Sequence, residues 1–431
     1  MDKPYIPRLF DEQLSFALKC KGAVVVTGPK WCGKSTTSRR HAKTIIDLMP
    51  IETRDNYVAY AKAAPHSFLT NCEHPLLIDE WQHVSFLWDQ IKYEVDESRE
   101  FGGYLLTGSV TDHLETTLSD EASEHTGNGR FDILRMRTLS LYESGEGNGN
   151  VSLSELANHR FSPCLCDLSI EDYAYLMCRG GWPLSVLAKE KEVALEQAFS
   201  YVRVLTEKDV FSLNSIKFAK NPQRAARILR AYARHISTAA ADETIFEDVK
   251  GAEGSLDNET IRRYLSAYEK LYVVDELESW SPYLRSRTVI RSKPTRHFVD
   301  PSIATASMGL SPEGLFADMA TFGLLFESLA IRDLRVYMES LRGKVYKYRD
   351  AKNREADAVL TFRDGSFALV EIKLGSKEDI DKAAEHLIDL SLDIDHAKTG
   401  KLAFLMVVTK DRLAYRRDDG VYVVPLGCLK N

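Results

Sequence analysis

The segment GPKWCGKS at residues 28–35 restricts the fold more than any other part of the chain. It fits the pattern GxxxxGK[ST] and lies between the apolar run AVVVT at 23–27 and a helix-forming stretch. Glycines at a strand-to-helix turn let backbone N–H groups surround phosphate groups. We therefore expect Lys34 to reach the β- and γ-phosphates of a nucleotide and Ser35 to bind Mg²⁺. The predicted nucleotide-binding residues are Gly28, Pro29, Lys30, Trp31, Cys32, Gly33, Lys34, Ser35 and Thr36.

A second motif, PLLIDEWQ at 75–82, argues that the match of residues 28–35 to the phosphate-binding pattern is not due to chance. A buried parallel strand would deliver Asp79 and Glu80 to the carboxyl edge of a sheet. Asp79 is expected to hold Mg²⁺ through water, and Glu80 to activate the attacking water. The run YLLTGS then places Thr107 or Ser109 beside the γ-phosphate, although a simple turn remains the alternative for that segment. ATP and Mg²⁺ are the predicted cofactors.

Length and composition indicate a globular chain of several domains. The chain has 431 residues, of which 44% are hydrophobic and 28% charged, so two or three separate cores are expected. Apolar runs at 23–27, 75–79 and 104–108 predict a parallel α/β sheet, with a helical segment up to about Met49 and no clear second strand between Met49 and PLLID. No apolar run approaches the length of a membrane span, and MDKPYIPRLF lacks the apolar stretch of a signal peptide. We expect a cytoplasmic protein without membrane contact.

Further motifs accompany these two: the loop HTGNGR, SLYESG, RGGWP, and the late segments READAV and VEIKLG. Together with GPKWCGKST, LLIDEWQ and LLTGS, they closely resemble a large prokaryotic family of AAA+ ATPases with an uncharacterised conserved C-terminal domain. The resemblance covers nearly the whole chain. It implies an AAA-type ATPase core, a winged-helix middle and a nuclease-like C-terminal domain.

Arg130, the last residue of HTGNGR, matches the Gly-Arg position of that family. Its guanidinium could neutralise charge on the transferring phosphoryl group, in its own subunit or in a neighbour's, so a homo-oligomer is possible. The alternative is an arginine bound to a carboxylate at the base of the loop.

The middle of the chain is the most basic part. Residues 211–300 carry 15 Lys and Arg against 12 Asp and Glu, in a chain of net charge −7. The order helix, helix, helix, two-stranded ribbon outlines a winged helix. The residues predicted to contact DNA are Arg224, Arg227 and Arg230 on one helical stripe, and Arg287 and Arg291 in a second acid-free run that extends to Arg296. A solvated helix face, or a partner for the acidic ATPase, is the alternative.

Four residues near the end resemble the PD-(D/E)XK nuclease core: Glu327 on a helix, Asp357 on a strand, and Glu371 with Lys373 on the next strand. Asp357 and Glu371 would hold a divalent metal, while Lys373 would position and deprotonate the attacking water. Strand alternation puts Glu371 and Lys373 on one face. Such a domain can also persist as a binding scaffold that does not cut, so both interpretations stay open.

The predicted fold class is therefore α/β: a P-loop AAA+ domain with a parallel sheet at 1–165, a helical lid or linker at 166–221, a winged-helix domain at 222–300, and an α/β PD-(D/E)XK-like domain at 301–431. Seven cysteines without paired CxxC spacing are expected to be reduced thiols rather than a zinc site. The predicted function is ATP hydrolysis coupled to DNA binding or processing. The alternative is a nucleotide-dependent regulatory scaffold with an inactive nuclease-like domain.

Overall fold

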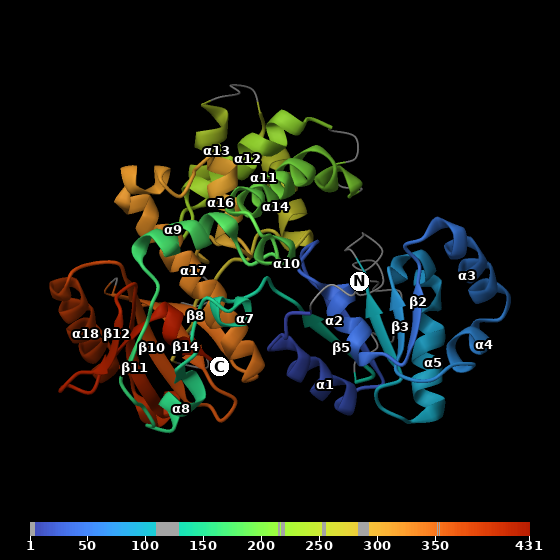
Figure 1. Ribbon diagram of the computed structural model, residues 1–431, viewed down its shortest axis with the longest axis horizontal. Helices are drawn as coiled ribbons and strands as arrows, with labels where there is room; N and C mark the ends of the chain where they lie inside the picture. Colours follow the sequence, from blue (N-terminus) through green and yellow to red (C-terminus); the bar gives the residue numbers. More distant parts are fainter. Residues whose placement is uncertain are drawn as a thin grey trace. The chain divides into compact units, whose positions relative to one another are not determined.

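The computed structural model describes residues 5–108, 129–213, 216, 220–251, 256–282, 293–350, 352 and 354–431. Two compact units are present, and Figure 1 follows the chain through them from blue to red. The first unit contains Met1–Arg137, Phe211–Lys220 and Lys270–Tyr272. The second contains Thr138–Val210, Asn221–Glu269 and Val273–Asn431. The N-terminal segment of the first unit thus ends at Arg137, whereas we predicted an ATPase core up to residue 165.

The first unit is built on a five-stranded parallel sheet with the order β2-β3-β4-β1-β5. Its strands are β1 (Ala23–Thr27), β2 (Thr44–Asp47), β3 (Leu76–Asp79), β4 (Tyr104–Thr107) and β5 (Phe131–Arg135). Its helices are α1 (Phe10–Cys20), α2 (Lys34–His41), α3 (Ile51–Ala63), α4 (Pro65–Thr70), the 3-10 helix η1 (Trp81–Leu87) and α5 (Trp88–Ser98). The predicted parallel sheet is confirmed.

Both faces of this sheet are covered, as alternate residues of β1 show. Val24 and Val26 join one buried cluster with Phe10 and Leu14 of α1. Ala23 and Val25, which point to the other face, belong to a different cluster. A strand buried on both faces favours apolar residues at successive positions, which explains the run AVVV before Thr27.

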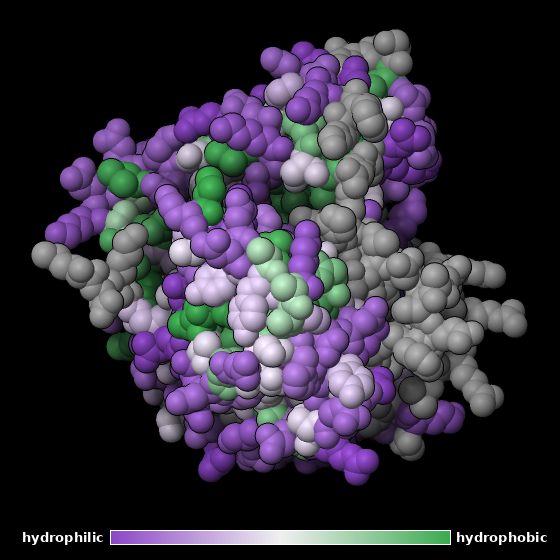
Figure 2. Space-filling view, turned by 90° about the vertical axis from the view of Figure 1, so that its right-hand side faces the viewer, coloured by the Kyte–Doolittle hydropathy of each residue, from purple (hydrophilic) through white to green (hydrophobic). Residues whose placement is uncertain are grey.

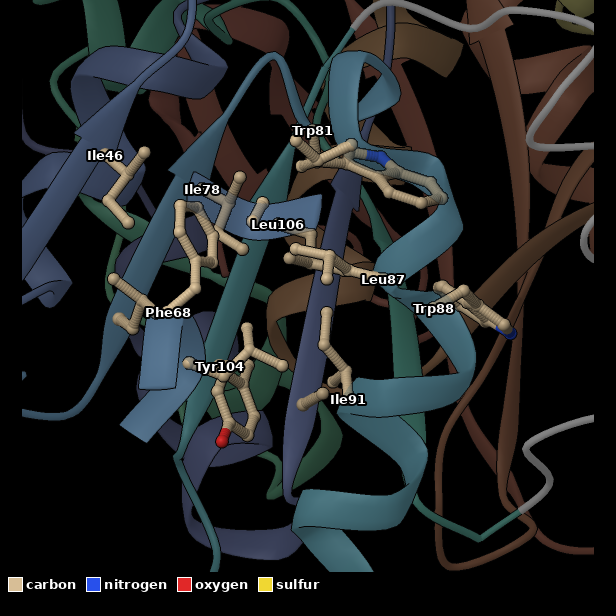
Figure 3. Close-up of a cluster of buried hydrophobic side chains, with 14 of the residues drawn as sticks. Ile46, Phe68, Ile78, Trp81, Leu87, Trp88, Ile91, Tyr104 and Leu106 are labelled. Carbon is tan, nitrogen blue, oxygen red and sulfur yellow. The ribbon is translucent and has the colours of Figure 1, made fainter. Parts of the chain in front are cut away.

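Figure 3 shows the second cluster. Ile46, Ile78 and Leu106 come from three neighbouring strands and lie on the face covered by Leu87 and Ile91. Burying a side chain of this size contributes roughly 1.5–3 kcal/mol relative to leaving it exposed. This packing fixes the strands β1, β3 and β4, whose carboxyl ends lie together at one edge of the sheet.

The strand β2 corrects the sequence prediction. We expected helix up to about Met49, but α2 ends at His41 and β2 follows at once. Because β2 lies at the edge of the sheet, only Ile46 of its four residues is buried, and no apolar run marks it.

The second unit contains most of the helices. They are α7 (Leu141–Ser144), α8 (Leu153–Ala157), α9 (Ile170–Arg179), α10 (Pro183–Val186), α11 (Lys191–Glu207), α12 (Pro222–Arg234), α13 (Asp242–Lys250), α14 (Asn258–Lys270), α16 (Pro301–Met308), α17 (Met319–Ser340), α18 (Lys377–Leu392) and α19 (His396–Thr399). The 3-10 helices η2 (Asp209–Ser212), η3 (Gly314–Ala317) and η4 (Leu426–Cys428) are short additions. After α14, two isolated antiparallel bridges join Val274 to Phe298 and Leu277 to Thr295, and the winged helix expected at that point of the chain stays a prediction.

The second unit also contains a seven-stranded mixed sheet with the order β7-β12-β13-β11-β10-β9-β8. Its strands are β7 (Cys164–Leu165), β8 (Lys344–Arg349), β9 (Glu355–Thr361), β10 (Phe367–Lys373), β11 (Leu402–Thr409), β12 (Leu413–Arg416) and β13 (Tyr422–Pro425). Strands β8, β9 and β10 are antiparallel, whereas β10, β11 and β13 run parallel. A separate pair joins β6 (Val151–Ser152) to β14 (Leu429–Lys430).

A buried ionic cluster explains why the second unit begins at Thr138. Arg332 binds Asp300 at 3.1 Å and Asp333 at 2.6 Å, and all three side chains are almost completely buried. The hydroxyl of Thr138 donates to Asp300 at 2.8 Å, and the N–H of Leu141 donates to Asp333 at 3.0 Å. Because a buried charge is costly without partners, these bonds tie the segment after Arg137 firmly to α17.

The outside of the molecule is mainly polar in the view of Figure 2, where hydrophobic residues form small separate groups. Across the described part of the chain, no helix is both long and apolar enough to cross a membrane.

Candidate functional site

The glycine-rich turn lies at the carboxyl edge of the first sheet, between β1 and α2. Gly28 has a φ of 139°, and a Cβ there would meet the carbonyl oxygen of Met136 at 2.2 Å, so only glycine fits. Gly33, with a φ of 102°, precedes the first turn of α2. The ammonium of Lys34 donates to the carbonyl oxygens of Gly28 at 2.9 Å and Pro29 at 2.8 Å. The turn thus holds a cation and the N–H groups of a helix start at one place, the arrangement that binds phosphate.

Three polar side chains meet at the ends of neighbouring elements beside this turn. The hydroxyl of Ser35 donates to Asp79 Oδ1 at 2.8 Å, and the hydroxyl of Thr107 donates to the same oxygen at 2.6 Å. Asp79 and Thr107 are almost fully buried at the ends of β3 and β4. The predicted grouping of Ser35, Asp79 and Thr107 is thus present in the geometry, whereas Ser109 lies outside the described residues.

Arg39 is a member of this cluster that the sequence analysis missed. It lies one turn after Ser35 on α2, and its guanidinium contacts Asp79 at 3.1 Å and Asp47 at 2.5 Å. Burial alone would lower the pKa of Arg39, but the hydrogen bonds to Asp47 and Asp79 raise it overall. The spacing of four residues after Ser35 was the available signal, since residues i and i+4 share a helix face.

Glu80 follows Asp79 in a left-handed conformation with a φ of 61°. Its carboxylate accepts a hydrogen bond from the side-chain amide of Gln82, a second residue that the sequence analysis missed. The side-chain oxygen Oε1 of Gln82 is buried without a hydrogen-bond partner among the described residues, and Gly108 of the LLTGS motif lies against it. Gln82 therefore sets the orientation of Glu80 at the edge of the sheet.

Arg130 does not join this cluster. Its backbone carbonyl accepts from the N–H of Ala23, at the beginning of β1, whereas the phosphate-binding turn follows Thr27 at the other end. A strand of five residues separates the two ends by roughly 13 Å. The Nε of Arg130 instead binds Asp96 Oδ1 at 2.5 Å, the ion pair with a carboxylate that we considered as the alternative. In this structure Arg130 therefore lies away from the turn of its own chain, and its role toward the phosphoryl group stays a prediction.

The basic residues of the middle segment divide into surface and buried groups. On α12, Arg227 and Arg230 are exposed and Arg224 is half-buried. Arg296, which we placed in the second basic run, is buried and binds Asp242 at 2.6 Å as well as Glu276. It is therefore a structural residue. Arg287 and Arg291 lie outside the described residues.

The late carboxylates and lysine do come together, on β9 and β10. Lys373 Nζ lies 2.5 Å from Glu371 and 3.3 Å from Asp357. Asp357 also accepts the backbone N–H of Ile372 at 2.8 Å, which fixes its position. The imidazole Nε2 of His386, on α18, lies 3.8 Å from Glu371 and is a neighbour that the sequence analysis missed.

Burial is the largest influence on the pKa values of the carboxylates around Lys373. Burial, followed by the charge of Asp357, raises the pKa of Glu371 to about 8. The same two causes raise the pKa of Glu327 on α17 well above its ordinary value. Burial lowers the pKa of Lys373, but Asp357 and Glu371 together raise it above its ordinary value. The ammonium of Lys373 thus lies between the carboxylates of Asp357 and Glu371, where a divalent cation could take its place.

The side-chain oxygen atoms at the two candidate sites suit a hard cation such as Mg²⁺, with two side chains at each site to hold it. Within the part of the chain that the structure describes, no group of three or more His, Cys, Asp or Glu side chains is arranged to hold a metal ion. Mg²⁺ typically keeps several waters and uses one or two carboxylates, and Asp357 with Glu371 provides two. At the first cluster, the Ser35 hydroxyl beside Asp79 is the matching pair.

The fold and the phosphate-binding turn define the first unit as a P-loop ATPase domain. In agreement, residues 21–144 match the family described as AAA domain. Two further segments match families described only as domains of unknown function, DUF8612 over residues 170–314 and DUF4143 over residues 322–429. A comparison with curated proteins found no match.

Among solved structures, a Walker-type ATPase of Pyrococcus abyssi is similar with a TM-score of 0.45 and 13% identity, over 70% of this chain and 96% of that one. The ORC2 protein of Aeropyrum pernix, in a structure with ADPNP and ADP, is similar with a TM-score of 0.33 and 13% identity, over 74% of this chain and 98% of that one. Likenesses at this level carry no functional assignment.

Proposed function

We propose that this protein hydrolyses ATP and couples its nucleotide state to DNA binding or processing by the C-terminal domain. The observation that carries the first part is the cluster of Lys34, Ser35, Asp79 and Thr107 at the carboxyl edge of the parallel sheet. ATP turnover by the full chain in Mg²⁺, measured beside a Lys34 variant, tests it.

In this proposal, Lys34 leaves the carbonyl oxygens of Gly28 and Pro29 and binds the β- and γ-phosphates. Ser35, and Asp79 through water, would hold Mg²⁺, which would neutralise phosphate charge when bound. Glu80 accepts a proton from the attacking water, and Gln82 orients its carboxylate. Arg130 would act in a neighbouring copy of the chain, which makes a homo-oligomer part of the proposal.

The C-terminal part of the proposal is a metal-dependent nuclease of the PD-(D/E)XK type. The order α17, β8, β9, β10, α18, α19, β11 supports it, together with the juxtaposition of Asp357, Glu371 and Lys373. Asp357 and Glu371 would hold the metal, which supplies a nucleophilic water. Lys373, released from the two carboxylates, would orient that water.

The raised pKa of Glu371 predicts that metal affinity depends on pH. The ionised carboxylate binds metal, and the pKa of about 8 means that binding must displace a proton below that pH. We expect affinity for Mn²⁺ to rise by about tenfold per pH unit between pH 6 and 8 and to level off above, since one proton is released. Isothermal titration of the full chain with Mn²⁺ measures this.

The control variants for this titration are Glu371→Gln and His386→Gln. Glu371→Gln should weaken binding and remove the slope, whereas His386→Gln should keep the slope between pH 7 and 8. An affinity that stays constant from pH 6 to 8 in the wild type would contradict the assignment of Glu371 as a ligand.

The middle segment would form a winged helix that contacts DNA through the arginine stripe of α12, the residues Arg224, Arg227 and Arg230. Changing all three arginines to Glu should weaken DNA binding. It should also reduce the slope of log affinity against log salt concentration by about 0.9 for each phosphate that the protein no longer neutralises. The basal rate of ATP hydrolysis should not change. Fluorescence anisotropy of a DNA duplex at several salt concentrations measures the slope.

A matched control reverses three exposed lysines of the first unit, Lys19, Lys43 and Lys62, and so changes the net charge equally. If both triple variants lose affinity to the same extent, only net charge matters and the stripe is a solvated face.

A nucleotide-dependent scaffold is the second candidate function. The observation that favours it is the ammonium of Lys373, which already neutralises Asp357 and Glu371 without a metal. Such a domain would bind DNA or protein without cutting it, and a DNA cleavage assay with Mg²⁺ or Mn²⁺ distinguishes the two.

A further inference from the structure

Arg8, just before α1, is a buried arginine whose guanidinium binds two main-chain carbonyls. The residue is only 7% exposed, although arginine is almost never fully buried unless it is paired. Its Nη1 donates to the carbonyl oxygen of Cys32 at 3.0 Å, and its Nη2 donates to the carbonyl oxygen of Arg137 at 2.8 Å. One guanidinium thus bridges the phosphate-binding turn and the residue at which the N-terminal segment of the first unit ends.

The turn and this segment also contact each other directly. The N–H of Met136 donates to the carbonyl oxygen of Thr27 at 2.8 Å, and the thiol of Cys32 lies 3.7 Å from the carbonyl oxygen of Met136. Gly28 packs so closely against the same carbonyl that no Cβ fits there. The turn therefore rests on Met136 and is held to the next residue, Arg137, through Arg8.

The hydrogen bond to Cys32 also sets the direction of the next N–H group. A trans peptide unit is planar, so its carbonyl and its N–H point in opposite directions. Because the carbonyl of Cys32 faces Arg8, the N–H of Gly33 faces away from Arg8. That N–H lies at the start of α2, where N–H groups lack partners within the helix and can bind phosphate. Arg8 therefore orients a phosphate-binding donor from the opposite side of the peptide.

The segment that carries Arg8 is itself fixed to α2. The N–H of Arg8 donates to Asp11 Oδ2 at 2.8 Å. The carboxylate of Asp11 also accepts from the hydroxyl of Tyr5 at 2.7 Å and lies 2.9 Å from Nε2 of His41, the last residue of α2. The planar fork of an arginine can serve two carbonyls at once, whereas the compact ammonium of a lysine cannot reproduce that geometry.

We propose that Arg8 is a positioning residue of the ATP site that transmits nucleotide occupancy from the phosphate-binding turn to the segment 136–137. A nucleotide that fixes the peptide after Cys32 also fixes Arg8, and Arg8 fixes the carbonyl of Arg137. The chain enters the second unit at the next residue, Thr138, whose hydroxyl is bound to Asp300. This inference rests on the proposed ATP binding and gives it a route along the chain into the second unit.

The first measurement separates affinity from turnover. Arg8→Met removes both hydrogen bonds and should weaken binding of a fluorescent ATP analogue in Mg²⁺ by roughly 10- to 100-fold. Hydrolysis at saturating ATP should stay near the wild-type rate, because Arg8 touches no reacting group and its loss should act on KM alone. Arg99→Met, at an exposed arginine of the same unit, removes the same charge and should bind ATP as the wild type does.

The second measurement is hydrogen exchange of the full chain with and without a non-hydrolysable ATP analogue and Mg²⁺. In the wild type, the analogue should slow exchange at the turn and also at residues 136–141, which include the N–H of Leu139 that donates to the carbonyl of Gly181. Arg8→Lys keeps the charge but loses the fork. At saturating analogue its turn should still be protected, whereas residues 136–141 should no longer respond.

The possible outcomes keep this inference apart from the proposed function. A wild type that binds the analogue without a response at residues 136–141 would overturn the inference alone, as would an undiminished response in Arg8→Lys. A wild type that binds no ATP would overturn the proposed function and the inference with it. The wild-type exchange pattern decides even where a variant at Arg8 fails to fold.

Discussion

We expect Lys34→Ala to weaken ATP binding severely, whereas Glu80→Gln should keep binding and lose hydrolysis. Lys34 provides the ammonium of the phosphate-binding turn, and loss of its charged hydrogen bonds, each contributing about 1.5–3 kcal/mol, should weaken ATP binding by roughly 100-fold or more. Glu80 follows Asp79 and, in the proposed mechanism, acts only on water, so its loss should lower turnover about 10²- to 10⁴-fold at unchanged affinity. Binding of a fluorescent ATP analogue and phosphate release measure the two effects.

Lys43→Ala is the control for these variants, because Lys43 is exposed and lies outside the cluster. It should bind and hydrolyse ATP as the wild type does. Hydrolysis by Glu80→Gln at the wild-type rate would assign another role to Glu80 and leave the activation of water to a different residue.

If the C-terminal domain is the proposed nuclease, Asp357→Asn and Lys373→Ala should each eliminate DNA cleavage in Mg²⁺ or Mn²⁺. Removal of a metal-holding carboxylate or of the lysine that orients water should cost several kcal/mol of transition-state stabilisation, about 10³-fold or more in rate. Cleavage of plasmid and linear DNA should be followed with and without a non-hydrolysable ATP analogue, since nucleotide state can gate access.

Asparagine is the better replacement for Asp357, because its side-chain oxygen can still accept the N–H of Ile372. Alanine would leave that N–H unpaired, at a cost of about 1–3 kcal/mol. Thermal unfolding of Asp357→Asn should match the wild type, and Lys377→Ala, an exposed lysine of α18, should cleave normally. A wild-type protein that binds metal but cuts no DNA would support the scaffold.

The sequence predicted those parts of the fold that local patterns encode. The runs at β1, β3 and β4 are buried on both faces, so each is apolar up to its last residue and easily recognised. β2 was missed because an edge strand with one buried residue carries no such pattern. β6 and β7 were missed because two-residue strands are defined only by partners near the chain end.

The residues of the candidate sites also divide into those that a local sequence pattern predicts and those that it does not. Ser35, Asp79 and Thr107 were found because parallel strands bring their carboxyl ends to one edge. Arg39, Gln82 and His386 were not found, since their roles depend on which way a side chain turns in the folded chain.

Long-range pairing at β7 also affects the order in which the chain can fold during synthesis. Leu165 pairs with Leu413, which follows it by 248 residues. At a typical elongation rate of about 5–20 residues per second, β7 waits roughly 12–50 s for its partner strand to leave the ribosome. The first unit contains its complete parallel sheet by Arg135 and can close early. The sheet of the second unit is completed only once β13 (Tyr422–Pro425) has been translated, long after β7.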